Sequence, residues 1–229
     1  MKKLCALIVF VGLALVGWAQ VPVAVVNGEP ITREELESAT RLNQILFQLY
    51  FQYPRFAQSL MGTPEGKAFL TRYQRDVLED LILRKIQVQE ARARKLAADP
   101  ARVEELVNQT LDYIKSYYDL TDEELVAELA QEGLTLEAFK AQLRPQAEEQ
   151  ALLEALKQAV TAEVTVSEEE IAAYYQANPS QFLDDQGKPL PLAEVRLKIA
   201  SLLASQKQDA LWQEWLKRAR ETASVQINL

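Results

Sequence analysis

Two short strand-like segments stand at opposite ends of a chain whose other patterns are helical. Residues 21–26 are apolar and rich in valine, and residues 225–229 alternate strictly between apolar and polar side chains. A single strand leaves its backbone N–H and C=O groups without partners, so each segment needs a neighbour. We therefore expect a mainly α-helical domain with a small two-stranded β element, in which residues 21–26 pair with residues 225–229.

Helical patterns fill the chain between these two segments. Capping boxes, in which Ser or Thr is followed three residues later by Glu, predict helix starts at Thr32, Thr121 and Ser167. The helix after Thr32 is expected to reach about residue 61, with a kink or break at Pro54 because proline cannot donate the helical hydrogen bond. The other long helices are expected over residues 67–96, 100–118, 136–162, 168–177 and 192–222.

The first 19 residues have the pattern of a secretory signal peptide. Lys2 and Lys3 precede the apolar run 4–16, and small residues at Gly17 and Ala19 predict cleavage after Ala19. The alternative is an uncleaved membrane anchor, but the run is shorter than the roughly 20 residues that a spanning helix needs. We expect export to the periplasm or another extracytoplasmic compartment, and no membrane span in residues 20–229.

Composition argues against several classes of function. The chain contains no histidine, which removes the most common general base and zinc ligand, and its single cysteine, Cys5, lies in the predicted signal peptide. A formal net charge of −8 opposes binding to nucleic acid. No glycine-rich phosphate-binding loop occurs, so ATP use is not supported. We expect no enzyme activity, no catalytic residues, no metal and no cofactor.

The segment from Leu46 to Phe56 is unusually aromatic. At 100° per residue its apolar side chains cover more than half of the helix circumference, whereas a surface helix needs one apolar stripe. The simpler interpretation is a helix packed on two sides. The functional interpretation is that one face lines a groove for a bound polypeptide, and a homodimer interface is an alternative. The candidate binding residues in this segment are Phe47, Tyr50, Phe51, Tyr53 and Phe56.

Tyrosines near residue 115 are a second group of candidates. Tyr117 and Tyr118, together with Tyr113, either continue the same binding surface or lie at the edge of the core with their hydroxyls in water. We include Tyr117 and Tyr118 among the candidate binding residues.

Three stretches resemble the SurA and PrsA type of exported chaperone. They are Val26-Asn27-Gly28-Glu29-Pro30-Ile31-Thr32 before a long helix, Val166–Ile171 followed by Asn178-Pro179-Ser180-Gln181-Phe182, and Pro191–Arg196 leading to a long helix and a final strand. Their order along the chain is that of the family. The resemblance implies a SurA N-terminal-like helical chaperone domain over residues 20–229.

One departure from the family pattern bears on function. Members commonly carry a parvulin prolyl isomerase domain before the final helix, and here only a short loop, residues 183–190, occupies that position. The parvulin site also uses histidines. The resemblance thus implies an ATP-independent holdase for unfolded or nascent exported proteins, without isomerase activity. The alternatives are a dedicated protein-binding adaptor or dimeric assembly factor and, less favoured, a prolyl isomerase.

Overall fold

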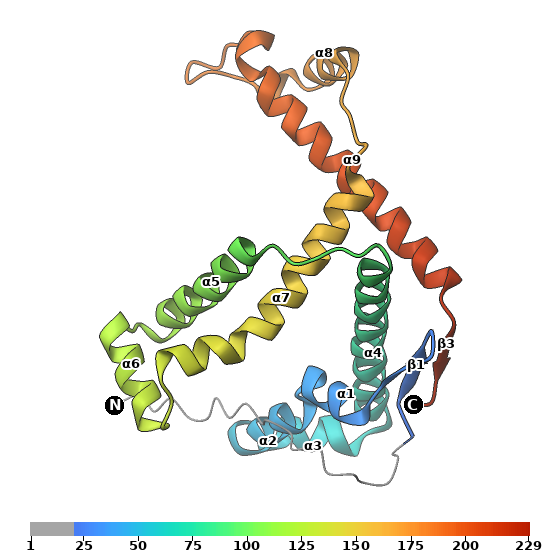
Figure 1. Cartoon of the computed structure of the whole chain (residues 1–229), viewed down its shortest axis with the longest axis vertical. Helices are drawn as coiled ribbons and strands as arrows, with labels where there is room; N and C mark the ends of the chain where they lie inside the picture. The colour runs from blue at the N-terminus through green and yellow to red at the C-terminus, as the bar shows by residue number, and fades with distance from the viewer. Residues whose placement is uncertain (1–20) are drawn as a thin grey trace. The chain divides into compact units, whose positions relative to one another are not determined.

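The computed structural model describes residues 21–229 (Figure 1), so the predicted signal peptide lies outside the described residues. The chain divides into two compact units. The first contains the residues up to Leu153 together with Ala223–Leu229, and the second is Glu154–Thr222. The boundary falls inside a long helix, α7 (Leu136–Thr161). In the part of the chain that the structure describes, no helix is long and apolar enough to cross a membrane.

A small antiparallel sheet in the first unit joins the two end segments. Its strands are β1 (Ala24–Val26), β2 (Glu29–Ile31) and β3 (Val225–Ile227), in the order β2-β1-β3. The predicted pairing is confirmed, with Val25 opposite Gln226. The sheet has three strands where two were expected, because Asn27 and Gly28 both adopt positive φ and reverse the chain at once. Pro30 then lies in an edge strand, where a residue without N–H is tolerated.

The predicted helix 32–61 is broken twice. The helices are α1 (Arg33–Thr40), α2 (Leu42–Gln52) and α3 (Pro54–Gly62). The break at Pro54 was expected, but the break at Arg41 was not. Arg41 adopts φ 47° and ψ 23°, in the left-handed region that arginine rarely occupies. The Tyr73 hydroxyl donates to the Thr40 carbonyl over 3.0 Å, so a contact from a distant helix supports this joint.

The helix α4 (Pro64–Ala93) organises the sheet side of the first unit, packing against α1, α3 and β1. Its buried ridge is formed by Leu78, Ile82 and Ile86. Two polar side chains of α4 also hold the hairpin. Lys85 Nζ donates to the Pro30 carbonyl over 2.9 Å, and Gln89 Nε2 donates to the Val26 carbonyl over 3.0 Å.

A second core in this unit lies among α5 (Pro100–Tyr118), α6 (Asp122–Gln131) and α7. The capping box of Thr121 and Glu124 starts α6 as predicted. Pro145 lies inside α7, which continues through it as one helix. The buried residues of this core are Val103, Leu106, Val107, Leu111, Leu125, Leu129, Phe139, Ala147 and Ala151.

The second unit is built on α8 (Glu168–Ala177), a short 3-10 turn η1 (Pro179–Gln181) and α9 (Leu192–Thr222). Its core contains Ile171, Phe182, Val195 and Ile199. The loop between η1 and α9 closes on itself: Leu183 bridges Pro189, and the Leu190 N–H donates to the Phe182 carbonyl over 2.7 Å. The two ends of this loop, at Phe182 and Leu190, therefore lie next to each other.

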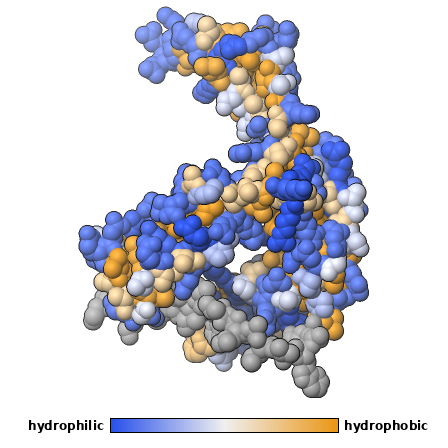
Figure 2. Space-filling view, viewed as in Figure 1, coloured by the Kyte–Doolittle hydropathy of each residue, from blue (hydrophilic) through white to orange (hydrophobic). Residues whose placement is uncertain are grey.

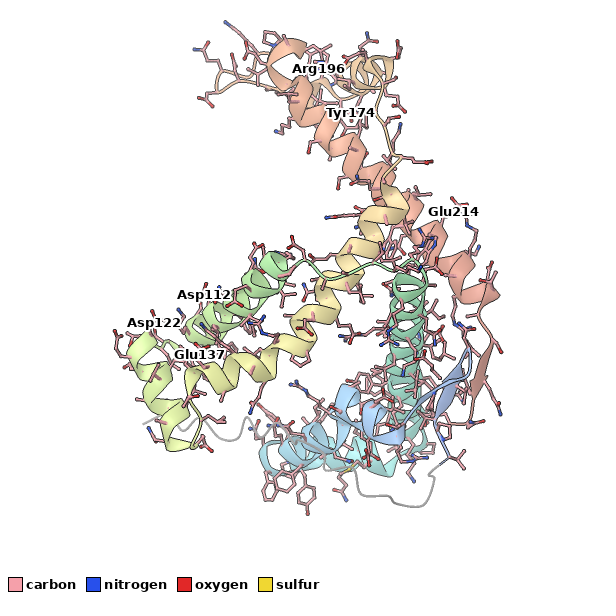
Figure 3. The ribbon with its side chains drawn as sticks, viewed as in Figure 1. Asp112, Asp122, Glu137, Tyr174, Arg196 and Glu214 are labelled. Atoms are coloured by element: carbon pink, nitrogen blue, oxygen red, sulfur yellow. The ribbon has the colours of Figure 1, made fainter. Side chains whose placement is uncertain are left out.

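The first turn of α8 carries three consecutive carboxylates. A hydrogen bond from Arg196 lowers the pKa of Glu168, the Ser167 side chain lowers the pKa of Glu169, and Lys207 lowers the pKa of Glu170. Arg196 of α9, labelled in Figure 3, donates to Glu168 at the start of α8 over 2.9 Å. These contacts favour the ionised carboxylates, as the free N–H groups of a helix start also do.

We expect the second unit to lose stability in acid. A carboxyl whose folded pKa is lowered adds stability above its unfolded pKa of about 4.3, and this stability is lost as pH falls through the folded pKa. Melting followed by circular dichroism should therefore show a fall in Tm below about pH 4.5, and Glu168→Gln should make this fall shallower. Glu221→Gln, at an exposed residue of α9, is the matched control. A Tm that is constant between about pH 6 and 3.5 would contradict the prediction.

Candidate functional site

The five candidate aromatic residues, which lie on α2, on α3 and at the residue that joins them, are all exposed. We call Phe47, Tyr50, Phe51, Tyr53 and Phe56 the α2–α3 aromatic surface. Phe47 is 65% and Phe51 67% exposed, and α2 contains no buried residue. The interpretation of α2 as a helix packed on two sides is therefore wrong. Large exposed apolar patches on a protein surface are commonly sites of interaction.

Helical spacing brings these rings together. Phe47 and Phe51 lie one turn apart, and their ring centroids are 4.7 Å apart at 58°. Tyr50 meets Phe51 edge-on at 5.8 Å. Tilted and edge-to-face arrangements are the favoured geometries of aromatic pairs. The three rings thus form a continuous apolar surface before anything binds to them.

The packing of α2 on α3 and of α3 on α4 fixes the position of the α2–α3 aromatic surface. Because α2 packs on α3 and α3 packs on α4, the position of the rings depends on the corner between α3 and α4. Ala57 of α3 is fully buried. At the corner the Thr63 hydroxyl oxygen accepts from the Gly66 N–H over 3.1 Å and donates to the Ser59 carbonyl over 2.8 Å.

The α2–α3 aromatic surface is almost free of charge. Between Arg41 and Arg55 the chain carries no Asp, Glu, Lys or Arg, although one quarter of all its residues are charged. The polar side chains within α2 are amides, which donate and accept hydrogen bonds without a charge preference. Such a surface suits apolar side chains and the backbone of an extended polypeptide. The amide residues are Asn43, Gln44, Gln48 and Gln52.

A second group of exposed rings lies at the end of α5. We call Tyr113, Tyr117 and Tyr118 the α5 tyrosine cluster. Tyr113 and Tyr117 stack at 6.0 Å, and Tyr118 meets Tyr117 edge-on at 4.9 Å. Tyr117 is 68% exposed, so it is not a residue of the core edge. Among the described residues the ring contacts join members within each of the two surfaces, and none joins one surface to the other.

A cavity of about 500 Å³ lies between the end of α4, the link to α5 and the Pro145 region of α7. Three of the charged side chains that line it, Arg92, Arg144 and Glu149, already form ion pairs. Arg144 donates to Glu104 over 2.7 Å, and Arg84 pairs with Glu149. No pattern along the chain marks this cavity, because it arises where three separate helices meet. Within residues 21–229 no group of three or more acidic, Cys or His side chains is placed to hold a metal ion.

Comparison with known protein families assigns the chain to one of them. The family model for the SurA-like N-terminal domain matches residues 1–153, more than half of the chain. The chain belongs to the SurA-like N-terminal domain family. The matched range ends where the first compact unit reaches its boundary at Leu153. The resemblance seen in the sequence is thus confirmed, whereas a single SurA-like domain over residues 20–229 stays a prediction.

Relatives of this SurA-like chain include foldase proteins. The foldase protein PrsA of Clostridium botulinum (strain Langeland) is 26% identical over 166 residues, which cover 72% of this chain and 47% of that protein. PrsA of Clostridium kluyveri is 27% identical over 181 residues, covering 79% of this chain and 52% of that protein. The chain therefore spans about half the length of the curated relatives that it matches.

A solved structure shares the SurA-like fold. It comes from a study of the virulence factor PEB4 and the periplasmic protein Cj1289, two structurally related SurA-like chaperones of Campylobacter jejuni. The TM-score is 0.55 at 10% identity, and the match covers 91% of this chain and 99% of that chain. The expected mainly α-helical SurA-like fold is confirmed by this likeness, which concerns the fold alone.

Proposed function

We propose that this protein is an ATP-independent chaperone that holds unfolded or partly folded exported polypeptides. The observation that carries the proposal is the α2–α3 aromatic surface, whose five rings are all exposed and of which Phe47, Tyr50 and Phe51 already contact one another on α2, a helix without buried residues. Membership of the SurA-like family and similarity to PrsA foldases support a chaperone role. The signal-peptide pattern of residues 1–19 supports an extracytoplasmic location.

Binding at such a surface is expected to be broad and modest in strength. Burial of apolar area stabilises a complex by about 25 cal/mol per Å², but ordering of a flexible client offsets much of this gain. Micromolar affinity with low sequence preference follows. No step of the binding requires nucleotide hydrolysis, so we further propose that the protein acts without ATP and without catalytic chemistry.

The proposal is tested by light scattering from a denaturing model client. Residues 20–229 should suppress aggregation at near-stoichiometric amounts in a buffer without ATP. An unrelated acidic protein of similar size at the same concentration is the control for crowding and charge. No suppression, together with a stable dimer in sedimentation, would contradict the proposal and favour an adaptor or assembly factor whose aromatic surface is covered by its own partner.

A further inference from the structure

The α5 tyrosine cluster continues the apolar stripe of α5 beyond the core. Leu111 is the last buried residue of this stripe, and the helix runs for nearly two more turns to Tyr118. Tyr113 is 67% and Tyr117 68% exposed. The end of α5 therefore presents stacked tyrosine faces that no other described element covers.

Carboxylates surround these rings. Residues 112–124 contain five Asp or Glu and one lysine, a net charge of −4. Asp112 and Asp122 both lie against Lys115, at 2.9 Å and 2.6 Å, and their hydrogen bonds raise the pKa of that lysine. Lys115 thus forms ion pairs with two carboxylates. Asp119 and Glu123, which are near them in the sequence, are exposed. Figure 3 shows Asp112 and Asp122 where α5 and α6 meet, with Glu137 of α7 at the same end.

The two aromatic surfaces differ in charge. Residues 42–62, which contain α2 and α3, carry one charged side chain, Arg55. The α5 tyrosine cluster instead combines electron-rich ring faces with a local excess of negative charge. Both features attract a cation, because a Lys or Arg side chain over a tyrosine face is stabilised by the ring quadrupole and by nearby carboxylates.

We infer that the α5 tyrosine cluster and its carboxylates form a second client subsite, selective for Lys- or Arg-containing segments of unfolded polypeptides. The inference rests on the proposed chaperone function and assigns different client segments to two surfaces. The α2–α3 aromatic surface takes apolar segments, and the end of α5 takes cationic ones. The stems of Lys and Arg side chains pack on the rings while their charged ends reach the carboxylates.

The test compares two labelled unfolded peptides by fluorescence anisotropy. Both contain the same apolar and aromatic residues, but one carries lysines where the other carries serines. The triple variant Asp112→Asn, Asp119→Asn, Glu123→Gln removes three charges and leaves Asp122 to hold Lys115. Asparagine tolerates the left-handed conformation of residue 119. In about 0.1 M salt, where the Debye length is about 10 Å, this variant should bind the lysine peptide about tenfold more weakly and the serine peptide equally well.

A matched variant separates a local site from general charge. Glu34→Gln, Asp76→Asn, Asp80→Asn removes the same charge from exposed residues of α1 and α4. It should leave lysine-peptide binding within about twofold of the parent, since exposed charges more than about 10 Å away are screened. An equal loss in both triple variants would overturn the inference.

Tyr117→Leu tests the role of the ring face. It keeps apolar area at residue 117 but removes the π face, so the lysine peptide should bind about threefold more weakly. Equal binding of both peptides by the parent chain, or no effect of either change at the end of α5, would overturn this inference. The proposed function would then still stand, since the serine peptide would remain bound. If neither peptide bound, the proposed function itself would fail.

Discussion

A protein with both Phe47→Ala and Phe51→Ala is expected to bind unfolded clients about 10- to 100-fold more weakly than the parent chain. The two rings contact each other at 4.7 Å and are more than half exposed. If a client covers roughly 100 Å² of each ring, about 5 kcal/mol of apolar transfer free energy is involved. Ordering costs offset part of it, so a loss of about 1.4 to 2.8 kcal/mol remains, which corresponds to the stated range.

The same change should leave the fold intact. Neither side chain is part of a core, and alanine favours a helix more than phenylalanine does. The free energy of unfolding from denaturant titration should therefore change by less than about 1 kcal/mol. Leu197→Ala removes an exposed apolar side chain from the second unit and is the matched control, with client binding unchanged. Reduced stability with unchanged binding per folded molecule would refute the role of the rings.

The second large effect is expected at the corner between α3 and α4. Gly66 is buried, and a Cβ atom at this position would lie 2.0 Å from the Leu60 carbonyl oxygen and 2.7 Å from the Leu60 Cα. These are backbone atoms, so the clash is relieved only by moving α3 away from α4. We expect Gly66→Ala to lower the free energy of unfolding by about 3 kcal/mol, measured by denaturant titration, as for severe overpacking.

Gly62 supplies the matched control for this prediction. It is exposed in the last turn of α3, and a Cβ atom there would meet nothing within 4 Å. Gly62→Ala should be neutral or stabilise by up to about 1 kcal/mol through helix propensity. Because α2 rests on α3, Gly66→Ala should also weaken client binding in the molecules that remain folded. Equal stability of the two variants would show that the corner tolerates side chains.

Features set by neighbouring residues were predictable from the sequence. The capping boxes at Thr32, Thr121 and Ser167 are all present, because side chain and backbone three residues apart satisfy each other locally. The break at Pro54 follows from the missing N–H of proline. The pairing of the end segments followed from the need of each strand for a partner.

Features set by distant contacts were not predictable in the same way. No glycine or proline marks the break at Arg41. The carbonyl of the preceding residue, Thr40, accepts a hydrogen bond from the hydroxyl of Tyr73 on α4. The exposure of α2 also depends on what lies beside it. Its periodicity describes how far apolar side chains extend around the helix, but only the folded structure, in which α2 packs on α3 and buries none of its residues, shows that they remain uncovered.

The sheet closes the longest loop in the described chain. The Ser224 N–H donates to the Asn27 side chain across 197 positions, and the Asn228 side chain donates to the Pro22 carbonyl across 206. The entropy of closing a loop must be overcome before such a contact stabilises anything, whereas helices and their corners form from near neighbours. We therefore expect the pairing of β1 with β3 to be the last part of the fold to form. Until β3 pairs with it, β1 has an unpaired edge, and the incompletely folded chain is exposed to the strand pairing between molecules that leads to aggregation.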